Sequence, residues 1–137
     1  MDNQLIIIRG LPGSGKSTYA KANFKGAFHI ENDMFHIKNG KYCFKRENQK
    51  DAVKWCLDTA TFALENGMDV VVSNTFTQKR FIDSYKAVAD RLGCGFKVYR
   101  MAGNYGTVHD VPAEVLESMK NFFEDYEGET MVVPHPL

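Results

Sequence analysis

The chain has 137 residues, of which 17 are Lys or Arg and 17 are Asp or Glu, so its formal net charge is zero. Apolar residues make up 44% and aromatic residues 12%, which is enough for a packed core and excludes a wholly disordered chain. The length predicts a single domain over residues 1–137, and the balanced charge excludes both a polybasic nucleic-acid coat and a highly acidic solvating chain.

The charges are unevenly distributed along the chain. Residues 1–50 contain nine basic and four acidic residues, whereas residues 110–129 contain seven acidic residues and one lysine. An anionic ligand is therefore expected near the N-terminal part of the chain.

Strand and helix patterns alternate along the sequence. The apolar run at residues 5–8 predicts a strand that is buried on both faces, and a glycine-rich turn separates it from a helix at residues 16–24. Further strands are predicted at residues 27–30, 68–72, 96–101 and 131–133, further helices at residues 48–66, 77–92 and 112–126, and a loop at residues 102–111.

This alternation predicts an α/β fold, in which a mainly parallel sheet has helices on both faces and right-handed crossovers. The last, acidic helix is expected to pack its apolar stripe on the sheet and to keep its carboxylates in solvent. The apolar run at residues 5–8 is too short for a signal peptide or a membrane span, and the three cysteines lack zinc-ligand spacing. We therefore expect a cytoplasmic protein with reduced thiols and no membrane contact.

The segment Gly10–Ser17, GLPGSGKS, matches the phosphate-loop pattern GxxxxGK[ST] in full and lies between a predicted strand and a predicted helix. Its glycines let successive N–H groups point into one concavity, to which the helix N-terminus adds partial positive charge. We expect Lys16 to reach the β- and γ-phosphates of ATP and the Ser17 hydroxyl to coordinate Mg²⁺. The predicted nucleotide-binding residues are Leu11, Pro12, Gly13, Ser14, Gly15, Lys16, Ser17 and Thr18.

Polar residues follow two of the other predicted strands. Asp33 comes just after the strand at residues 27–30, so we expect it to face the phosphate loop, where a carboxylate can accept a proton from an attacking hydroxyl. The alternative is a solvated side chain or a helix N-cap. Ser73 and Asn74 end the next strand, where many phosphate-loop enzymes place an aspartate; they can hold a water in the Mg²⁺ shell or form a plain turn.

The order and spacing of these segments resemble the P-loop kinases related to the 5′-hydroxyl polynucleotide kinase domain, with zeta-toxin and AAA-type small ATP-binding kinases as wider kin. Residues 11–20 resemble the opening of that family, Asp33 matches its general base, and residues 73–75 resemble its Asp-Thr-Asn segment. Asn104 and residues 109–112 resemble its lid. The resemblance spans residues 5–126 and implies a three-layer P-loop NTPase fold.

The resemblance also implies an ATP- and Mg²⁺-dependent kinase that transfers a γ-phosphoryl group to a hydroxyl, with a polynucleotide 5′ end as the first choice of acceptor. The segment at residues 35–50, after Asp33, mixes basic residues with aromatic ones. This composition suits such an acceptor, and the alternative is a solvated surface loop. The alternatives are a kinase for a small molecule, such as a nucleoside or an antibiotic, and an ATP-binding module without phosphoryl transfer.

The chain departs from the family pattern around the lid. Family members usually carry arginine there, but residues 102–107 contain no basic residue, and a histidine replaces the arginine that follows the base. The nearest candidate cations are His109 and Arg100. The candidate lid or acceptor residues are therefore His36, Asn74, Arg100, Asn104 and His109.

Overall fold

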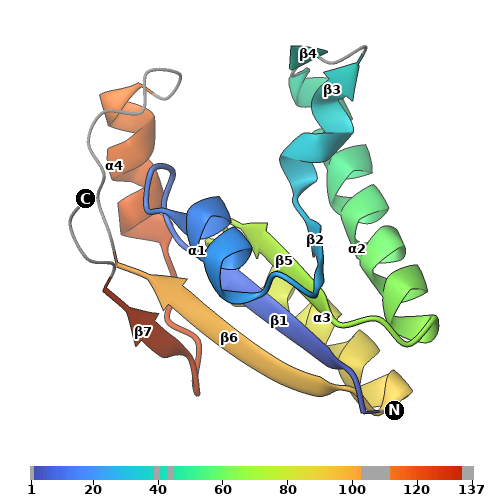
Figure 1. Ribbon diagram of the computed structural model, residues 1–137. Coiled ribbons are helices and arrows are strands. Elements are labelled where there is room, and N and C mark those ends of the chain that lie inside the picture. The colour runs from blue at the N-terminus through green and yellow to red at the C-terminus, as the bar shows by residue number, and fades with distance from the viewer. Residues whose placement is uncertain (1, 39–40, 43–44, 103–111, 134–137) are drawn as a thin grey trace.

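The computed structural model describes residues 2–38, 41–42, 45–102 and 112–133. Its centre is a five-stranded sheet in the order β2-β5-β1-β6-β7, in which all neighbouring strands are parallel (Figure 1). The strands are β1 (Gln4–Arg9), β2 (Phe28–Ile30), β5 (Val70–Asn74), β6 (Gly95–Met101) and β7 (Thr130–Val132), and the helices are α1 (Lys16–Asn23), α2 (Gln49–Glu65), α3 (Lys79–Leu92) and α4 (Ala113–Phe122). The predicted α/β fold is confirmed.

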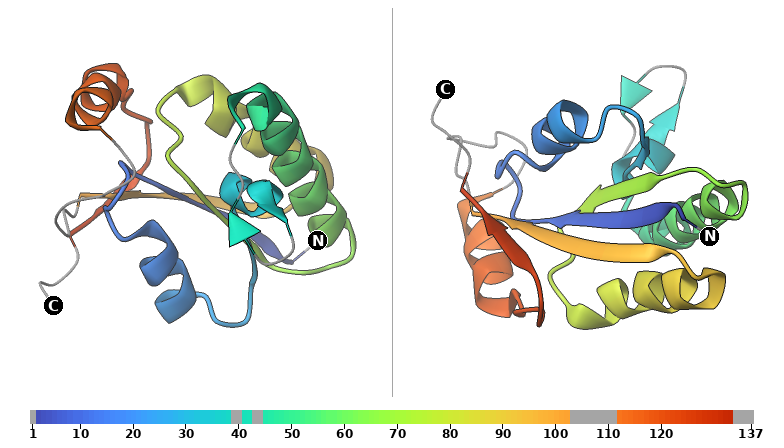
Figure 2. Two further views of the ribbon diagram at one scale, coloured as in Figure 1. Left: turned by 90° about the horizontal axis from the view of Figure 1, so that it is seen from above. Right: turned by 60° about the horizontal axis from the view of Figure 1, so that its bottom comes forward.

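The sheet is covered on both faces, as Figure 2 shows, with α1 on one side and α2 and α3 on the other. The apolar run of β1 divides between the two faces, because alternate side chains of a strand point in opposite directions. Leu5 and Ile7 join the core beneath α2 and α3, whereas Ile6 and Ile8 join the core beneath α1. This explains why the run is continuous rather than alternating.

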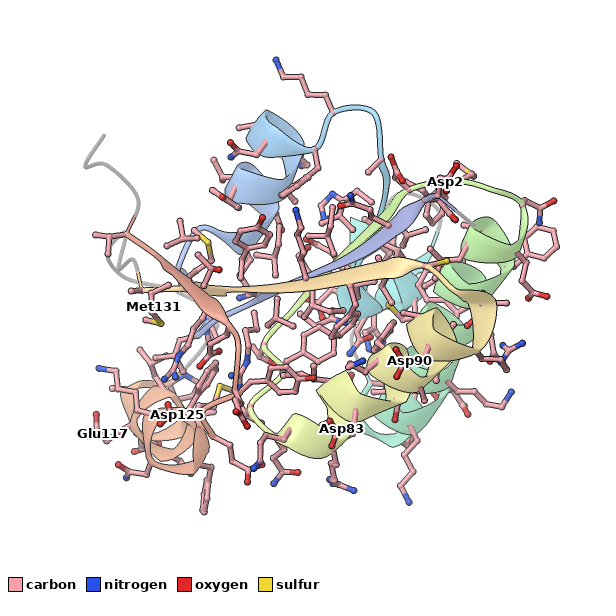
Figure 3. The ribbon with its side chains drawn as sticks, turned by 90° about the horizontal axis from the view of Figure 1, so that it is seen from below. Asp2, Asp83, Asp90, Glu117, Asp125 and Met131 are labelled. Carbon is pink, nitrogen blue, oxygen red and sulfur yellow. The ribbon has the colours of Figure 1, made fainter. Side chains whose placement is uncertain are left out.

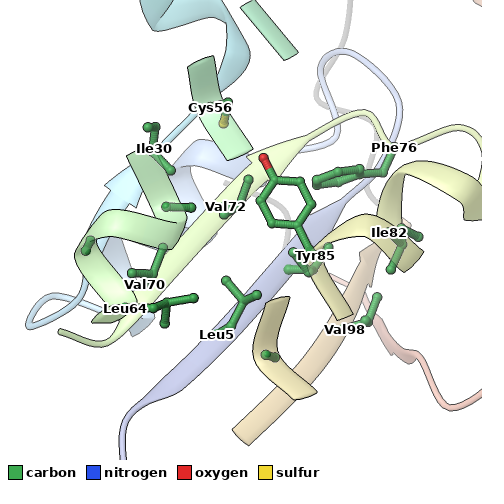
Figure 4. Close-up of a cluster of buried hydrophobic side chains, with 14 residues drawn as sticks. Leu5, Ile30, Cys56, Leu64, Val70, Val72, Phe76, Ile82, Tyr85 and Val98 are labelled. Atoms are coloured by element: carbon green, nitrogen blue, oxygen red, sulfur yellow. The ribbon is translucent and has the colours of Figure 1, made fainter. Parts of the chain in front are cut away.

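The larger core lies between the sheet and the helices α2 and α3 (Figure 4). Full burial of one such aliphatic side chain contributes about 1.5–3 kcal/mol, so this layer contributes strongly to the stability of the fold. Its buried members are Leu5, Ile7, Ile30, Cys56, Ala60, Ala63, Leu64, Val70, Val72, Phe76, Ile82, Tyr85, Ala89 and Val98.

Four short elements between β2 and α2 were not predicted from the sequence. They are the 3₁₀ helices η1 (Asn32–His36) and η2 (Arg46–Asn48) and the antiparallel hairpin of β3 (Ile37–Lys38) and β4 (Lys41–Tyr42). Each has two to five residues, which is less than the length over which a strand or helix periodicity can be recognised. The first of them, η1, carries the predicted base.

The last helix differs from the expectation. It ends at Phe122 rather than near Tyr126, because Phe123 has an extended backbone, and none of its residues is buried. Its apolar stripe therefore does not pack on the sheet, and the Val115 and Phe122 side chains remain 40% and 64% exposed. The carboxylates do face solvent, as Glu117 on α4 and Asp125 after it illustrate in Figure 3.

The parallel strands bring three connections to one edge of the sheet: the phosphate loop after β1, the segment η1 after β2, and residues 75–78 after β5. Ligands of parallel α/β sheets bind at this edge. Within the described residues, none of the helices combines the length and apolarity that crossing a bilayer demands.

Candidate active site

The phosphate loop joins the central strand β1 to α1. Gly13 and Gly15 have φ angles of 79° and 91°, in the left-handed region that favours glycine. The turn is closed by the backbone N–H of Ser14, which donates to the carbonyl of Leu11 at 3.1 Å. No described side chain caps α1, so its first N–H groups are available to an anion.

Two polar groups inside this loop fit a bound phosphate. The Ser14 hydroxyl is buried and has no hydrogen-bond partner among the described residues, which is unusual for a buried polar atom. The Lys16 ammonium donates to the carbonyl of Leu11 at 3.0 Å. Burial lowers the pKa of Lys16 to about 8, against the opposing pull of Glu31 and Asp33. A phosphate in the loop would supply an acceptor for the Ser14 hydroxyl and a further negative charge beside Lys16.

A carboxylate lies beside Ser17, and it belongs to Glu31 at the end of β2. One oxygen of Glu31, Oε2, accepts hydrogen bonds from the hydroxyls of Ser17 and Ser73, the latter at 2.5 Å. The same oxygen is 3.1 Å from Nε2 of His29. Burial by itself raises the pKa of Glu31, but the hydrogen bonds from His29, Ser17 and Ser73 outweigh it and hold the pKa at about 2.

The two polar residues at the end of β5 face opposite ways. Ser73 points toward Glu31 and is also 2.6 Å from His29 Nε2. Asn74 points toward η1 and α2 instead: its side-chain oxygen accepts from the backbone N–H of Asn32 at 2.8 Å, and its amide lies 3.8 Å from Cys56 Sγ. Asn74 therefore fixes the start of η1, which carries the predicted base.

Asp33 is the second residue of η1, and its side chain is exposed. It is close enough to Lys16 to raise the pKa of that lysine. Three residues later, His36 is buried, and its Nε2 lies 2.9 Å from Oε1 of Gln49 in α2. The structure thus brings Asp33 toward the loop lysine and places His36 in the packing between η1 and α2.

The remaining predicted residues divide into three groups. Leu11, Pro12 and Gly13 are half-buried in the loop, and Thr18 is exposed on α1. Arg100 Nη1 pairs with Asp125 at 2.5 Å and with Glu129 at 3.2 Å, so its charge is engaged on the C-terminal segment. Asn104 and His109 lie outside the described residues.

A buried arginine that the sequence did not single out links the loop strand to the C-terminal segment. Arg9, the last residue of β1, is fully buried; it donates to the carbonyls of Phe76 and Glu124 at 2.6 and 2.7 Å and pairs with Glu129 at 2.8 Å. The ring of Phe123 contacts the guanidinium groups of both Arg9 and Arg100, whose Cζ atoms lie 4.2 and 4.5 Å from its centroid. This cluster fastens the segment after α4 to the carboxyl end of β1.

Two cavities open near the carboxyl edge of the sheet. One, of about 200 Å³, lies between η1, α2, β5 and α3, and no charged side chain occurs among the described residues that line it. Asn32, Gln49 and Asn74 contribute amides to it, and Leu57 and Phe81 contribute apolar surface. The other, of about 380 Å³, lies between residues 75–78 and the apolar stripe of α4.

The donor set beside the loop fits Mg²⁺. Magnesium prefers oxygen ligands, and the Ser17 hydroxyl and the Glu31 carboxylate supply them next to the phosphate site. In the described part of the chain, no three His, Cys, Asp or Glu side chains come together as a cage for a metal ion. In phosphoryl-transfer sites, one or two protein oxygens usually hold magnesium, and the phosphates of the substrate and water complete its coordination.

A glycine-rich loop at the end of the central strand, with a lysine and a serine at the start of the following helix, defines a P-loop nucleotide-binding protein. The chain belongs to the P-loop kinase family described as AAA domain, which matches residues 5–102. It is 34% identical over 131 residues to an uncharacterized protein of Pasteurella multocida, PM0531, covering 84% of this chain and 73% of that protein.

Kinases occur among its other relatives and structural neighbours. The chain is 33% identical over 100 residues to a putative bifunctional polynucleotide kinase/RNA ligase of Autographa californica nuclear polyhedrosis virus, covering 63% of this chain and 14% of the viral protein. A gluconokinase of Sinorhizobium meliloti has the same fold, with a TM-score of 0.68, 19% identity, and coverage of 95% of this chain and 82% of that one. The chain therefore spans only a small part of the viral relative.

Proposed function

We propose that this protein is a kinase that transfers the γ-phosphoryl group of ATP to an acceptor hydroxyl. The observation that carries the proposal is the loop lysine Lys16, largely removed from solvent, beside the hydroxyl of Ser17 and the exposed carboxylate of Asp33 at one edge of the sheet. Lys16 and the loop N–H groups would hold the phosphates. Mg²⁺, when bound at Ser17, would neutralise phosphate charge and align the γ-phosphate.

The proposed reaction uses Asp33 as the general base. The Asp33 carboxylate accepts the proton of the acceptor hydroxyl as its oxygen bonds to the γ-phosphorus, and the bond from that phosphorus to the bridging oxygen breaks. The electron pair of the broken bond stays on ADP. Lys16 and the N-terminus of α1 stabilise the charge on the phosphoryl oxygens during the transfer.

A polynucleotide 5′ end is the first choice of acceptor. It is supported by the viral relative, whose name describes a polynucleotide kinase. It is also supported by the basic segment that leads into α2, in which the described side chains of Lys45, before the helix, and Lys50, in its first turn, are exposed and free to meet phosphates.

A small uncharged hydroxyl compound is the second candidate. The cavity of about 200 Å³ beside η1 supports it, because amides and apolar surface recognise the hydroxyls and carbon faces of a nucleoside or a sugar.

The test of the acceptor is a panel assay with γ-labelled ATP. We expect label in DNA or RNA oligonucleotides with a free 5′ hydroxyl and none in oligonucleotides blocked at that position. Label in nucleosides or sugars alone would establish the second candidate. Binding of ATP without transfer to any member of the panel would support a nucleotide-binding module.

Replacing Lys16 by alanine is expected to weaken ATP binding by roughly 10- to 100-fold, because the variant loses a charge-assisted contact of about 1.5–3 kcal/mol with the phosphates. Isothermal titration calorimetry measures the effect directly. Lys21→Ala is the matched control, since Lys21 is an exposed lysine in the last turn of the same helix. Unchanged affinity in Lys16→Ala would refute the assignment of the phosphate site.

A further inference from the structure

We infer that Glu31, at the end of β2, supplies the carboxylate of the Mg²⁺ site, in the place of the strand-end aspartate that β5 lacks. The inference rests on the proposed function, since it concerns the metal that accompanies ATP. It is independent of the acceptor and of the base.

Glu31 lies next to the predicted metal ligand of the phosphate loop. The Ser17 hydroxyl, which is the predicted metal ligand of the loop, donates its hydrogen bond to Oε2 of Glu31. A carboxylate oxygen is thus within one hydrogen bond of the group that binds Mg²⁺ in phosphate loops. Carboxylate and hydroxyl oxygens are the donors that Mg²⁺ accepts, so both side chains can serve the same ion.

Two neighbouring side chains hold the Glu31 carboxylate in place. Ser73 donates to Oε2 at 2.5 Å, and His29 lies 3.1 Å from the same oxygen, so two strands hold the carboxylate in one orientation. Partners of this kind orient the groups around a metal and tune their affinity. The side chain of Glu31 is 20% exposed, so an ion can reach it from solvent.

The neighbouring strand β5 places no carboxylate beside Ser17, since it ends in Ser73 and Asn74. On β5, the side chain that faces this cluster is that of Ser73, whose hydroxyl shares the acceptor Glu31 Oε2 with the hydroxyl of Ser17. Ser73 carries no charge. Asn74 points away from this cluster, into the hydrogen bonds with Asn32. Beside Ser17, β5 therefore contributes an uncharged hydroxyl, and the carboxylate comes from Glu31 after β2.

The test compares ATP affinity with Mg²⁺ and with EDTA in Glu31→Gln. The glutamine keeps the size and the hydrogen-bonding capacity of the side chain but removes the charge. With Mg²⁺ present, we expect the stimulation of ATP binding by the metal to fall by roughly 10- to 100-fold, the range found when a group that supports a metal site is lost. In EDTA, the affinity should be equal or higher, because a negative charge near the phosphates has been removed.

The matched control is Glu65→Gln, which removes an exposed carboxylate at the end of α2. It should keep the wild-type response to Mg²⁺. Undiminished stimulation by Mg²⁺ in Glu31→Gln would overturn the inference, and so would an equal loss of affinity in Mg²⁺ and in EDTA. Failure of the wild-type protein to bind ATP in either condition would instead refute the proposed function, and the inference would fall with it.

A second measurement needs no variant. When Fe²⁺ is substituted for Mg²⁺ in the presence of ATP, hydrogen peroxide and ascorbate, the peroxide oxidises the bound iron and yields hydroxyl radicals that cut the backbone next to the metal, and ascorbate reduces the iron again. We expect cuts near residues 17 and 31 in the wild-type protein, located by mass spectrometry. Cutting near residue 17 with none near residue 31 would contradict the assignment of Glu31.

Discussion

Replacing Asp33 by asparagine is expected to lower the rate of phosphoryl transfer by roughly 10²- to 10⁴-fold, the range of a general base, while the affinity for ATP stays close to that of the wild type. The asparagine keeps the shape of the side chain but cannot accept the proton of the acceptor hydroxyl. Affinity should persist because Asp33 is exposed and lies outside the loop that holds the phosphates. Single-turnover assays with saturating Mg²⁺ and ATP measure the chemical step.

The control for this variant is Asp83→Asn, which removes an exposed carboxylate on the outer side of α3 (Figure 3). It should leave both transfer and ATP affinity unchanged. Equal transfer rates in Asp33→Asn and the wild type would show that another group, or none, accepts the proton. A loss of ATP affinity as large as the loss of rate would assign Asp33 to nucleotide binding instead.

Replacing Arg9 by methionine is expected to cost about 3–5 kcal/mol of unfolding free energy, the range for breaking a buried ion pair. Methionine fills part of the volume but leaves the carbonyls of Phe76 and Glu124 without their donor. Arg100 remains 3.2 Å from the other oxygen of Glu129, which favours the lower end of this range. Urea denaturation followed by circular dichroism gives the free energy, and the melting temperature should fall by about 10 °C.

Arg91→Met serves as the control, because Arg91 is exposed in the last turn of α3. We expect a change within about 0.5 kcal/mol there. The double variant Arg9→Met/Glu129→Gln should recover part of the loss, since it removes a carboxylate that has lost one of its two arginine partners. A loss in Arg9→Met no larger than that in Arg91→Met would show that the cluster around Phe123 does not stabilise the fold.

The central strand and the loop after it could be predicted from the sequence because their signals are local. Four consecutive apolar residues at positions 5–8 indicate a strand with two buried faces. Residues 10–17 match the spacing of glycines, lysine and serine that is specific for a phosphate loop. The glycine conformations follow from the same motif, with positive φ at Gly13 and Gly15. Asp33 could be placed on the loop side of the sheet because it comes within three residues of the end of a strand.

Glu31 could not be selected from the sequence, because its role depends on which way neighbouring strand ends face. Glu31, Ser73 and Asn74 all follow or end strands at the same edge, but a shift of one residue along a strand turns a side chain to the other face. The structure sends Ser73 toward Glu31 and Asn74 toward Asn32. A glutamate directly after a β-strand, two residues before the predicted base, was the available signal.

The C-terminal segment shows a second limit of local patterns. Helical periodicity from residue 112 to residue 126 predicts one helix packed on the sheet, yet the helix stops at Phe122. The reason is a long-range contact: Phe123 leaves the helix, and its ring lies against the guanidinium groups of Arg9 and Arg100, which come from the strands β1 and β6. Arg100, a candidate cation for the lid, is engaged in the same cluster through Asp125 and Glu129.

The fate of the two phosphate labels of ATP tests the central claim most directly. The wild-type protein is incubated with Mg²⁺, the acceptor panel and ATP labelled at either the γ- or the α-phosphate. We predict that the γ-label alone enters an acceptor, as a phosphomonoester that alkaline phosphatase removes, with ADP as the other product. Transfer of the α-label, or bound ATP with no label in any acceptor, would contradict the assignment of this P-loop protein as a kinase.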